Sequence, residues 1–305
     1  MQAQVVGAVP HAASAAVPGA VSNVLSGAFF GTTPRPAGPL LGELAGVLFL
    51  VVLIEAAWQR FGLRRSVEWR GVAASMADAL VRRSVDLAGL TLAAPVPAFA
   101  FAHRLATIPM HGVARWAGLF LLVEFAYYWH HRAAHRVRWF WATHSVHHSS
   151  NELMLASAIR LGWTGRLGGA LLFYSPLVWI GFPPQAVFGL VTAGLFYQFW
   201  IHADWLPRLG PFEWVLNTPA HHRVHHASNA EYLDCNYGSV LIVFDRLFGS
   251  FVAERDDIAI RYGLVHPVRS HNPVRIAFDG WLAMGRAVVA ARGVRARLGV
   301  LFGPP

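Results

Sequence analysis

Histidine is the residue type in this chain best suited to chemistry, and it occurs in three short clusters. Imidazole binds transition metals while remaining neutral, so several imidazoles at helical spacing are typical of a metal site. Residues three and four positions apart lie on one face of a helix, so the rings of each cluster are expected to converge. The clusters are His131 with His135, then His144, His147 and His148, and finally His222, His225 and His226.

Three further histidines need separate treatment. His130 and His221 each precede a cluster histidine by one position and lie roughly 100° around a helix from it. We interpret both as neighbours of the site and not as ligands. His202 stands alone, and a lone histidine is more often hydrogen-bonded than metal-bound. We include His202 among the predicted ligands because the uncharged run before it leads toward the last cluster.

The spacing leaves the metal open, because sites built from nitrogen alone suit zinc, copper, iron or nickel. A chance enrichment of histidine on packed helices would account for one such cluster, but it accounts for three poorly. The single cysteine, Cys235, excludes an internal disulfide and a set of thiolate ligands.

Composition indicates a membrane protein. The hydrophobic fraction is 55% and the charged fraction 13%, and the mean hydropathy is +0.42, values unusual for a soluble domain. We predict an all-α, polytopic membrane protein with about four to five hydrophobic helices and a cytoplasmic-face helical cap that carries the histidine clusters. Spans are expected at about 40–58, 85–102 and 113–129, and an uncharged helical hairpin at 167–201, broken by proline at Gly181–Pro184.

Charge placement predicts orientation and partners. The Lys+Arg total of 25 is all arginine, and six arginines crowd the segment 60–83, which places that loop, both histidine regions and the C-terminus in the cytoplasm, at a bacterial inner membrane. The net charge of +9 fits anionic lipid headgroups better than nucleic acid. Residues 1–37 are expected to be a disordered tail and 38–305 a single domain. The segment 272–302 is either an amphipathic helix on the membrane surface or a helix packed on its own domain.

Several ordered runs resemble the membrane fatty acid hydroxylase and sterol desaturase superfamily. The resemblance covers roughly residues 40–305, and its nearest subgroup is bacterial sterol-desaturase-like proteins and alkylglycerol monooxygenase. Glu124 and Cys235 stand where family members often have Asp and Lys, and neither change removes a ligand. The runs that carry the resemblance are Glu124 to His135, Trp141 to Ser150, Thr218 to His226, Asp234 to Gly238 and Phe244 to Phe251.

The resemblance implies two non-haem iron ions that activate dioxygen and attack a C–H bond of a fatty acyl, sterol, isoprenoid or ether lipid, by hydroxylation or desaturation. Electrons would come from a separate reductase, ferredoxin or cytochrome, because the chain has no cysteine set for an iron–sulfur cluster and no Gly-rich dinucleotide motif. Some relatives use ten histidines, so Asn236, water or an off-face histidine would complete the nine found here.

Four acidic residues are candidates to orient the ligand rings through their second nitrogen, or else to pair with Arg132 or Arg223 as structural bridges. They are Glu124, Asp204, Asp234 and Asp245. Two other functions remain open: a membrane zinc metallohydrolase, and a non-catalytic metal-binding or transport protein.

Overall fold

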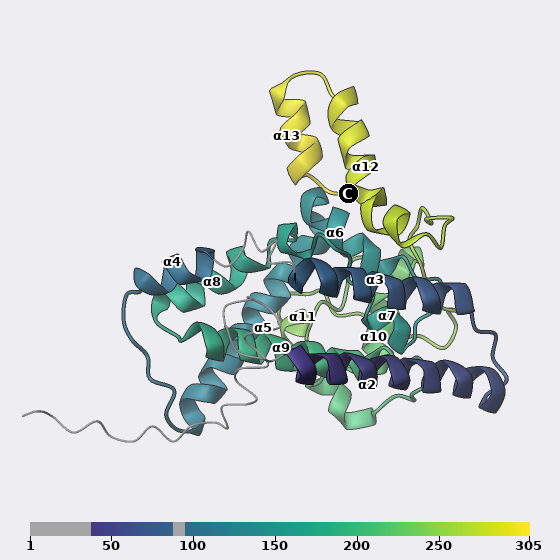
Figure 1. Ribbon diagram of the computed structural model, residues 1–305, viewed down its shortest axis with the longest axis horizontal. Helices are drawn as coiled ribbons and strands as arrows, with labels where there is room; N and C mark the ends of the chain where they lie inside the picture. Colours follow the sequence, from purple (N-terminus) through teal and green to yellow (C-terminus); the bar gives the residue numbers. More distant parts are fainter. Residues whose placement is uncertain (1–37, 88–94) are drawn as a thin grey trace, which may run out of the picture.

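The computed structural model describes residues 38–87 and 95–305, and in these ranges the chain folds as helices without a β-strand. The predicted tail, 1–37, lies outside the described residues. The longer helices are α2 (Gly38–Ala57), α3 (Trp69–Leu87), α4 (Pro95–Ala102), α5 (Val113–Arg136), α6 (Arg138–His148), α8 (Ala170–Ile180), α9 (Pro184–Ile201), α12 (Pro273–Ala290) and α13 (Val294–Phe302). Short helices are α7 (Leu155–Ala158), α10 (Pro219–His225) and α11 (Val243–Leu247), with a π-helical turn at Trp58–Gly62. Figure 1 shows their arrangement.

The prediction of a polytopic membrane protein is wrong for the part of the chain that the structure describes, although its all-α character is confirmed. Within residues 38–87 and 95–305, no helix has both the length and the apolar composition needed to cross a membrane. The cytoplasmic orientation at a bacterial inner membrane, predicted from the arginines, stays a prediction.

Each predicted span shows why hydropathy alone misled. The span 85–102 is not one helix in the described residues, because α3 ends at Leu87 and α4 is only 8 residues long; residues 88–94 lie outside them. The span 113–129 is the first part of α5, which continues into its histidine-bearing end. The predicted hairpin forms as α8 and α9, but the 11 residues of α8 reach only about 16 Å against the ~30 Å of a bilayer core. The span 40–58 coincides with the backbone of α2, and the side chains of residues 38–45 lie outside the described residues.

The apolar segments instead pack on one another in two main cores. Leu119 and Val123 of α5 meet Val178 of α8 and Val187 of α9, all nearly fully buried. The turn between α8 and α9 needs glycine at position 181, where φ is 134° and a Cβ would lie 2.3 Å from the carbonyl oxygen of Ala106. The second core joins α2, α3 and α7 around Val52, Val72 and Leu155. Helices α5 and α9, which position His131, His135 and His202, are part of the first core.

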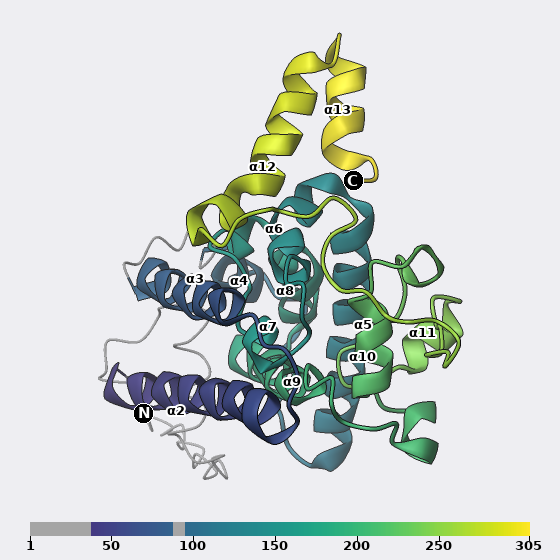
Figure 2. The same cartoon turned by 90° about the vertical axis from the view of Figure 1, so that its right-hand side faces the viewer.

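The C-terminal helices form a hairpin that stands out from the body in two perpendicular views (Figures 1 and 2). Asn272 begins α12 as an N-cap, accepting hydrogen bonds from the amides of Val274 and Arg275. Ile276 and Met284 of α12 are buried, and Gly280 lies against Ala142 of α6, where a Cβ would be 2.9 Å from the Ala142 carbonyl oxygen. Of the two interpretations of 272–302, this contact supports packing of α12 on its own domain.

Candidate metal centre

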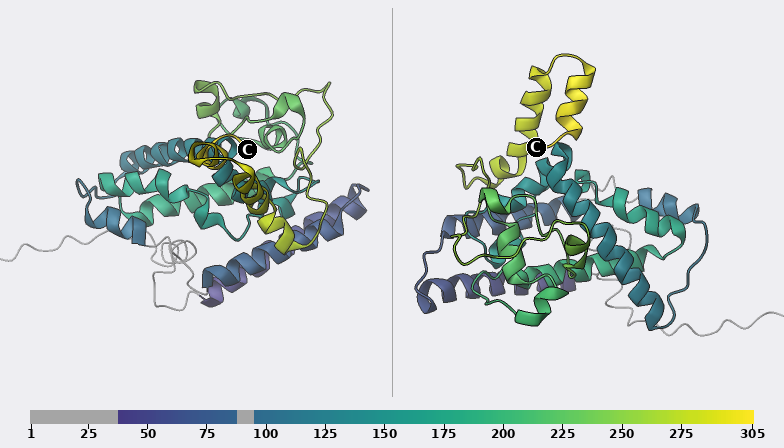
Figure 3. Two further views of the ribbon diagram at one scale, coloured as in Figure 1. Left: turned by 90° about the horizontal axis from the view of Figure 1, so that it is seen from above. Right: turned by 180° about the vertical axis from the view of Figure 1, so that it is seen from behind.

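Four helices bring the predicted ligands together. His131 and His135 lie near the end of α5, three histidines lie in the last turns of α6, His202 directly follows α9, and the last cluster lies on α10 and its C-cap. The green segment that includes α10 and α11 lies across one side of the molecule (Figure 3, right). Pro219 begins α10, and the Thr218 hydroxyl donates to Glu213 Oε1 (3.3 Å) and does not cap the helix.

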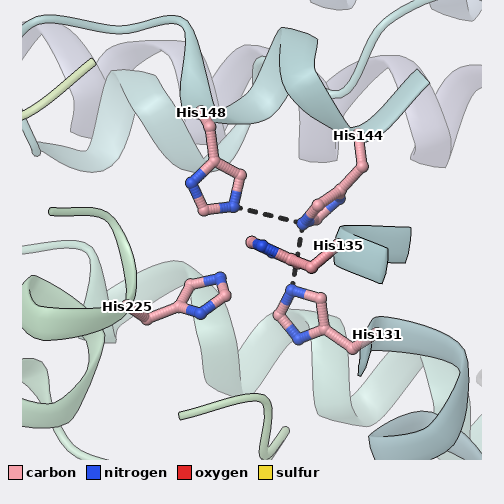
Figure 4. Close-up of side chains that lie close together, drawn as sticks. All are labelled: His131, His135, His144, His148 and His225. Carbon is pink, nitrogen blue, oxygen red and sulfur yellow. Dashed lines mark hydrogen bonds between the residues drawn. The ribbon is translucent and has the colours of Figure 1, made fainter. Parts of the chain in front are cut away.

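Five of these histidines form one group, which we call the five-histidine group. Its members are His131, His135, His144, His148 and His225, and one nitrogen of each lies within 4.8 Å of the others. Figure 4 shows their rings pointing toward one space. His144 Nε2 lies 3.0 Å from His131 Nε2 and 3.2 Å from His148 Nε2.

The other four form a second group, the four-histidine group, made of His147, His202, His222 and His226. Its Nε2 atoms follow one another closely, from His147 to His202 at 3.2 Å, to His222 at 3.0 Å and to His226 at 3.1 Å. The two groups touch, since the rings of His148 and His226 stack with centroids 4.3 Å apart. All nine predicted ligands therefore lie in two adjoining groups.

The division differs from the one expected from helical faces. We expected the three histidines of α6 to converge, but His144 and His148 belong to the five-histidine group while His147 belongs to the other. The last cluster divides in the opposite sense, with His225 in the five-histidine group and His222 and His226 in the other. Residues four apart share a group, and the intervening residue, turned by roughly 100° from its neighbour, points into the second group.

His130 and His221 lie in neither group. His130 Nε2 is hydrogen-bonded to the carbonyl oxygen of Gly168 (3.0 Å), and the ring of His221 packs edge-on against Phe251. The structure thus separates each from the histidine that follows it.

Burial keeps the rings of both groups neutral. Desolvation is the largest cause lowering the pKa of His147, to about 4, and it holds the pKa of His131 and His222 well below the usual value for histidine. Neutral imidazole is the protonation state that binds a metal.

Backbone carbonyls fix which nitrogen faces each group. His131 Nδ1 lies 2.9 Å from the Tyr237 oxygen and His225 Nδ1 lies 2.9 Å from the Cys235 oxygen. A carbonyl oxygen only accepts hydrogen bonds, so Nδ1 of each ring carries the proton and Nε2 presents a lone pair to the group.

The tautomers of His147 and His202 create an electrostatic conflict that a bound cation would resolve. His147 Nδ1 donates to the Arg160 oxygen (3.2 Å) and His202 Nδ1 to the Gln198 oxygen (2.6 Å), so their Nε2 atoms face each other at 3.2 Å with two lone pairs and no proton between them. In the five-histidine group, His135 Nε2 and His225 Nε2 are buried without a hydrogen-bond partner. Both groups therefore fit a metal ion, which accepts several lone pairs at once.

Two of the four acidic candidates bind backbone amides. Glu124 accepts hydrogen bonds from the amides of Val240 and Leu241 (2.9 and 2.8 Å). Asp245 accepts from the amides of Tyr237 and Gly238 (2.7 Å each). These two carboxylates hold the segment whose carbonyls orient His131 and His225.

The remaining candidates behave differently from one another. Asp204 pairs with Arg65 (2.9 Å), and Arg223 pairs with Glu254 instead (2.7 Å). Asp234 lies 3.7 Å from His135 Nδ1 and also pairs with Arg136, so it is the one acidic candidate beside a ligand ring. Asn236 is committed to the backbone of His221 and Val252 and joins neither group.

Sequence reasoning missed the carbonyl acceptors of Arg160, Gln198, Cys235 and Tyr237. A backbone carbonyl is present at every position, so residue type gives no signal for this role. The residue types at positions 234 and 236 give one indirect signal. Asp234 and Asn236 both have positive φ (59° and 55°), a conformation that Asn and Asp tolerate better than most residues.

Comparison with known proteins agrees with this geometry. Residues 116–250, which contain both histidine groups, match the family described as fatty acid hydroxylase. These residues form a fatty acid hydroxylase domain. The chain is similar to alkylglycerol monooxygenase of Homo sapiens, at 39% identity over 203 residues, covering 67% of this chain and 45% of the relative. The Xenopus tropicalis protein of the same name is 38% identical over 203 residues, with the same coverage.

A bacterial relative is also similar. Ornithine lipid hydroxylase of Rhizobium tropici is 30% identical over 131 residues, covering 43% of this chain and 40% of the relative. The chain thus spans less than half the length of these curated relatives. No solved structure matches it significantly.

Proposed function

We propose that this protein is a lipid monooxygenase that holds two iron ions and uses dioxygen to hydroxylate a C–H bond of a lipid. The observation that carries the proposal is the pair of adjoining, buried groups of five and four histidines. Iron bound in such sites activates dioxygen, given electrons and an open coordination position. One ion would be held by each group.

The composition of the groups favours oxidation over hydrolysis. A metallohydrolase needs a carboxylate base beside its metal-bound water. In the part of the chain that the structure describes, neither group contains an aspartate or glutamate. The nearby Asp234 is occupied by Arg136.

The chain positions the nitrogens that would bind the metals and keeps water away from them. Eight of the nine rings are buried, and His144 is half-buried, so water is largely excluded from the nitrogens that would bind the metals. The carbonyls of Tyr237, Cys235, Arg160 and Gln198 hold the proton of each partner ring on Nδ1. The rings are thereby preorganised, which lowers the cost of binding the metals.

Two partners are implied. The substrate is a lipid, with an ether lipid as the first candidate because the relatives with 38–39% identity are named alkylglycerol monooxygenase; we place the reaction at a membrane surface, where such lipids reside. Electrons would come from a separate reductase, ferredoxin or cytochrome, because one cysteine cannot hold an iron–sulfur cluster.

Isotope incorporation tests the proposal. Iron-loaded protein, supplied with a chemical reductant and a 1-O-alkylglycerol under ¹⁸O₂, should form an oxidised lipid that contains one ¹⁸O atom. Zinc-loaded protein should form none. Product formed by the zinc protein without reductant would identify a hydrolase instead.

A further inference from the structure

A second polar site lies beside the metal centre. A pocket of about 270 Å³ opens between the start of α3, the segment after α6 and the loop before α12. Its polar lining includes Arg160, Arg269 and His271, with Ser149, Asn151 and Glu68, and no histidine of either metal group. The volume is slightly below the ~300 Å³ at which small-molecule sites usually begin. It suits a small polar group and not a lipid chain.

Arg160 gives the pocket its chemistry. The residue is only 3% exposed, and its guanidinium donates to the hydroxyls of Ser75 and Ser149 (2.9 and 3.2 Å) and to the carbonyl oxygen of Gly71 (2.8 Å). All three acceptors are neutral. A buried cation is normally paired with an anion, because its desolvation is otherwise uncompensated.

The nearest acidic side chains, Asp78 and Glu68, act on Arg160 through their charges, but neither accepts a hydrogen bond from its guanidinium. Asp78 Oδ2 accepts from the amides of Leu161 and Gly162 (3.0 Å each), and Glu68 pairs with His271 (3.2 Å). Arg269 adds a second guanidinium at the exposed rim. Two guanidinium groups with hydroxyl and amide donors match the oxygens of a phosphate or carboxylate.

The pocket is joined directly to the metal centre. The carbonyl oxygen of Arg160 holds His147 of the four-histidine group (3.2 Å), and Ser149 follows His148 of the five-histidine group in sequence. The Ser149 hydroxyl already donates to the carbonyl oxygen of Val146 (2.7 Å), so a ligand would be held by Arg160, whose own carbonyl oxygen contacts His147.

We propose that this pocket binds a phosphate or carboxylate group and, resting on the proposed function, that this group belongs to the headgroup of the lipid substrate. The headgroup would be anchored beside the centre while the remainder of the lipid stays outside the pocket. The same chemistry would also bind a free anion, and the two sources are separated below.

Phosphate binding by the full-length protein tests the pocket without any turnover. Calorimetric titration with inorganic phosphate should show saturable binding at one site. Arg269→Gln should weaken it by roughly threefold to fivefold, as expected for an exposed charge, and Glu68→Gln should tighten it by removing a repelling carboxylate. Arg275→Gln, an exposed arginine at the start of α12 outside the pocket, should bind as wild type does. Absence of saturation, or equal affinity of Arg269→Gln and wild type, would overturn the site.

Arg160→Lys should weaken phosphate binding by about tenfold or more, because a buried forked contact is lost. Arg160 also stabilises the fold through its hydrogen bonds to Ser75 and Gly71, so the thermal unfolding of the Arg160→Lys variant is measured alongside. The exposed Arg269 keeps the test decisive if Arg160→Lys fails to fold.

Turnover distinguishes a headgroup from a free anion. Arg269→Gln should raise the KM for a 1-O-alkylglycerol 3-phosphate and leave unchanged both its kcat and the KM for the uncharged 1-O-alkylglycerol. Phosphate binding with no change in either KM would contradict the headgroup assignment. Phosphate binding by a protein that oxidises neither lipid would contradict the proposed function and leave the anion site standing.

Discussion

The two histidine groups share α6 and α10, but α5 contributes only to the five-histidine group and the end of α9 only to the four-histidine group, and the groups differ in access and in what holds them. The five-histidine group includes the half-buried His144 and lies beside the partly exposed Asp234. The four-histidine group is entirely buried. The carbonyls that orient the first group come from the segment 235–237, whereas those that orient the second come from Arg160 and the end of α9. We therefore expect that an ion in the five-histidine group would be accessible and an ion in the four-histidine group sheltered, each group having its own support.

The largest expected effect separates ligands from neighbours within each group. His131→Ala and His222→Ala each remove a converging nitrogen, so each should lose most metal from its own group and more than about 100-fold in activity. His130→Ala and His221→Ala, whose rings point elsewhere, should retain most iron and most product formation. Elemental analysis and product assays of the four variants measure this, and equal losses within either pair would contradict the division of the clusters.

A smaller effect should follow from the carboxylates that hold each support. Asp245→Asn weakens the hydrogen bonds from the amides of Tyr237 and Gly238 and should lower the metal affinity of the five-histidine group by about tenfold. Asp78→Asn weakens the contacts to Leu161 and Gly162 beside Arg160 and should act on the four-histidine group. Competition with a coloured chelator would show which affinity changes, and loss from the same group in both variants would refute separate supports.

These supports mark the limit of what the sequence could reveal. Spacing found eight of the nine histidines of the two groups, because imidazoles gathered at helical spacing seldom serve packing alone. The ninth, His202, stands alone in the sequence and was included only because the uncharged run before it leads toward the last cluster. It could not divide His147 from His148, since that depends on where α9 and α10 lie in space. Residue type identified Glu124 and Asp245 as candidates, but it could not predict that they bind backbone amides.

Hydropathy failed for a different physical reason. An apolar run lowers its free energy equally well in lipid or against another helix, and Leu119, Val178 and Val187 pack within the protein. Only the fold distinguishes these two outcomes.

Metal release should proceed in two phases, with a difference of severalfold in rate. A chelator reaches the five-histidine group past His144, while the four-histidine group opens only when packed helices separate. Metal content followed during dialysis against chelator should pause near one ion per chain. A single phase that removes both ions together would show that the groups do not differ in access.

A further prediction concerns how the stability of the metal-free protein depends on pH. Burial lowers the pKa of His147 and of His221 to about 4, so the stability that these neutral rings provide is complete above pH 6.5 and is lost as pH falls toward 4, by about 1.4 kcal/mol per pKa unit. Burial raises the pKa of Glu124 to about 7. The stability that its neutral carboxyl provides is therefore present below pH 4.5 and is lost as pH rises through 7. Because depressed histidines outnumber raised carboxylates, denaturant unfolding should show a net loss of stability from pH 6.5 to 4, and stability that rises in that range would refute the burial argument.

Anomalous diffraction from crystals of iron-loaded protein tests the central claim most directly. Data collected above the iron edge should show two peaks per chain, one enclosed by the five-histidine group and one by the four-histidine group. A single peak, peaks outside these groups, or anomalous signal at the zinc edge alone from protein prepared with both metals would contradict the account.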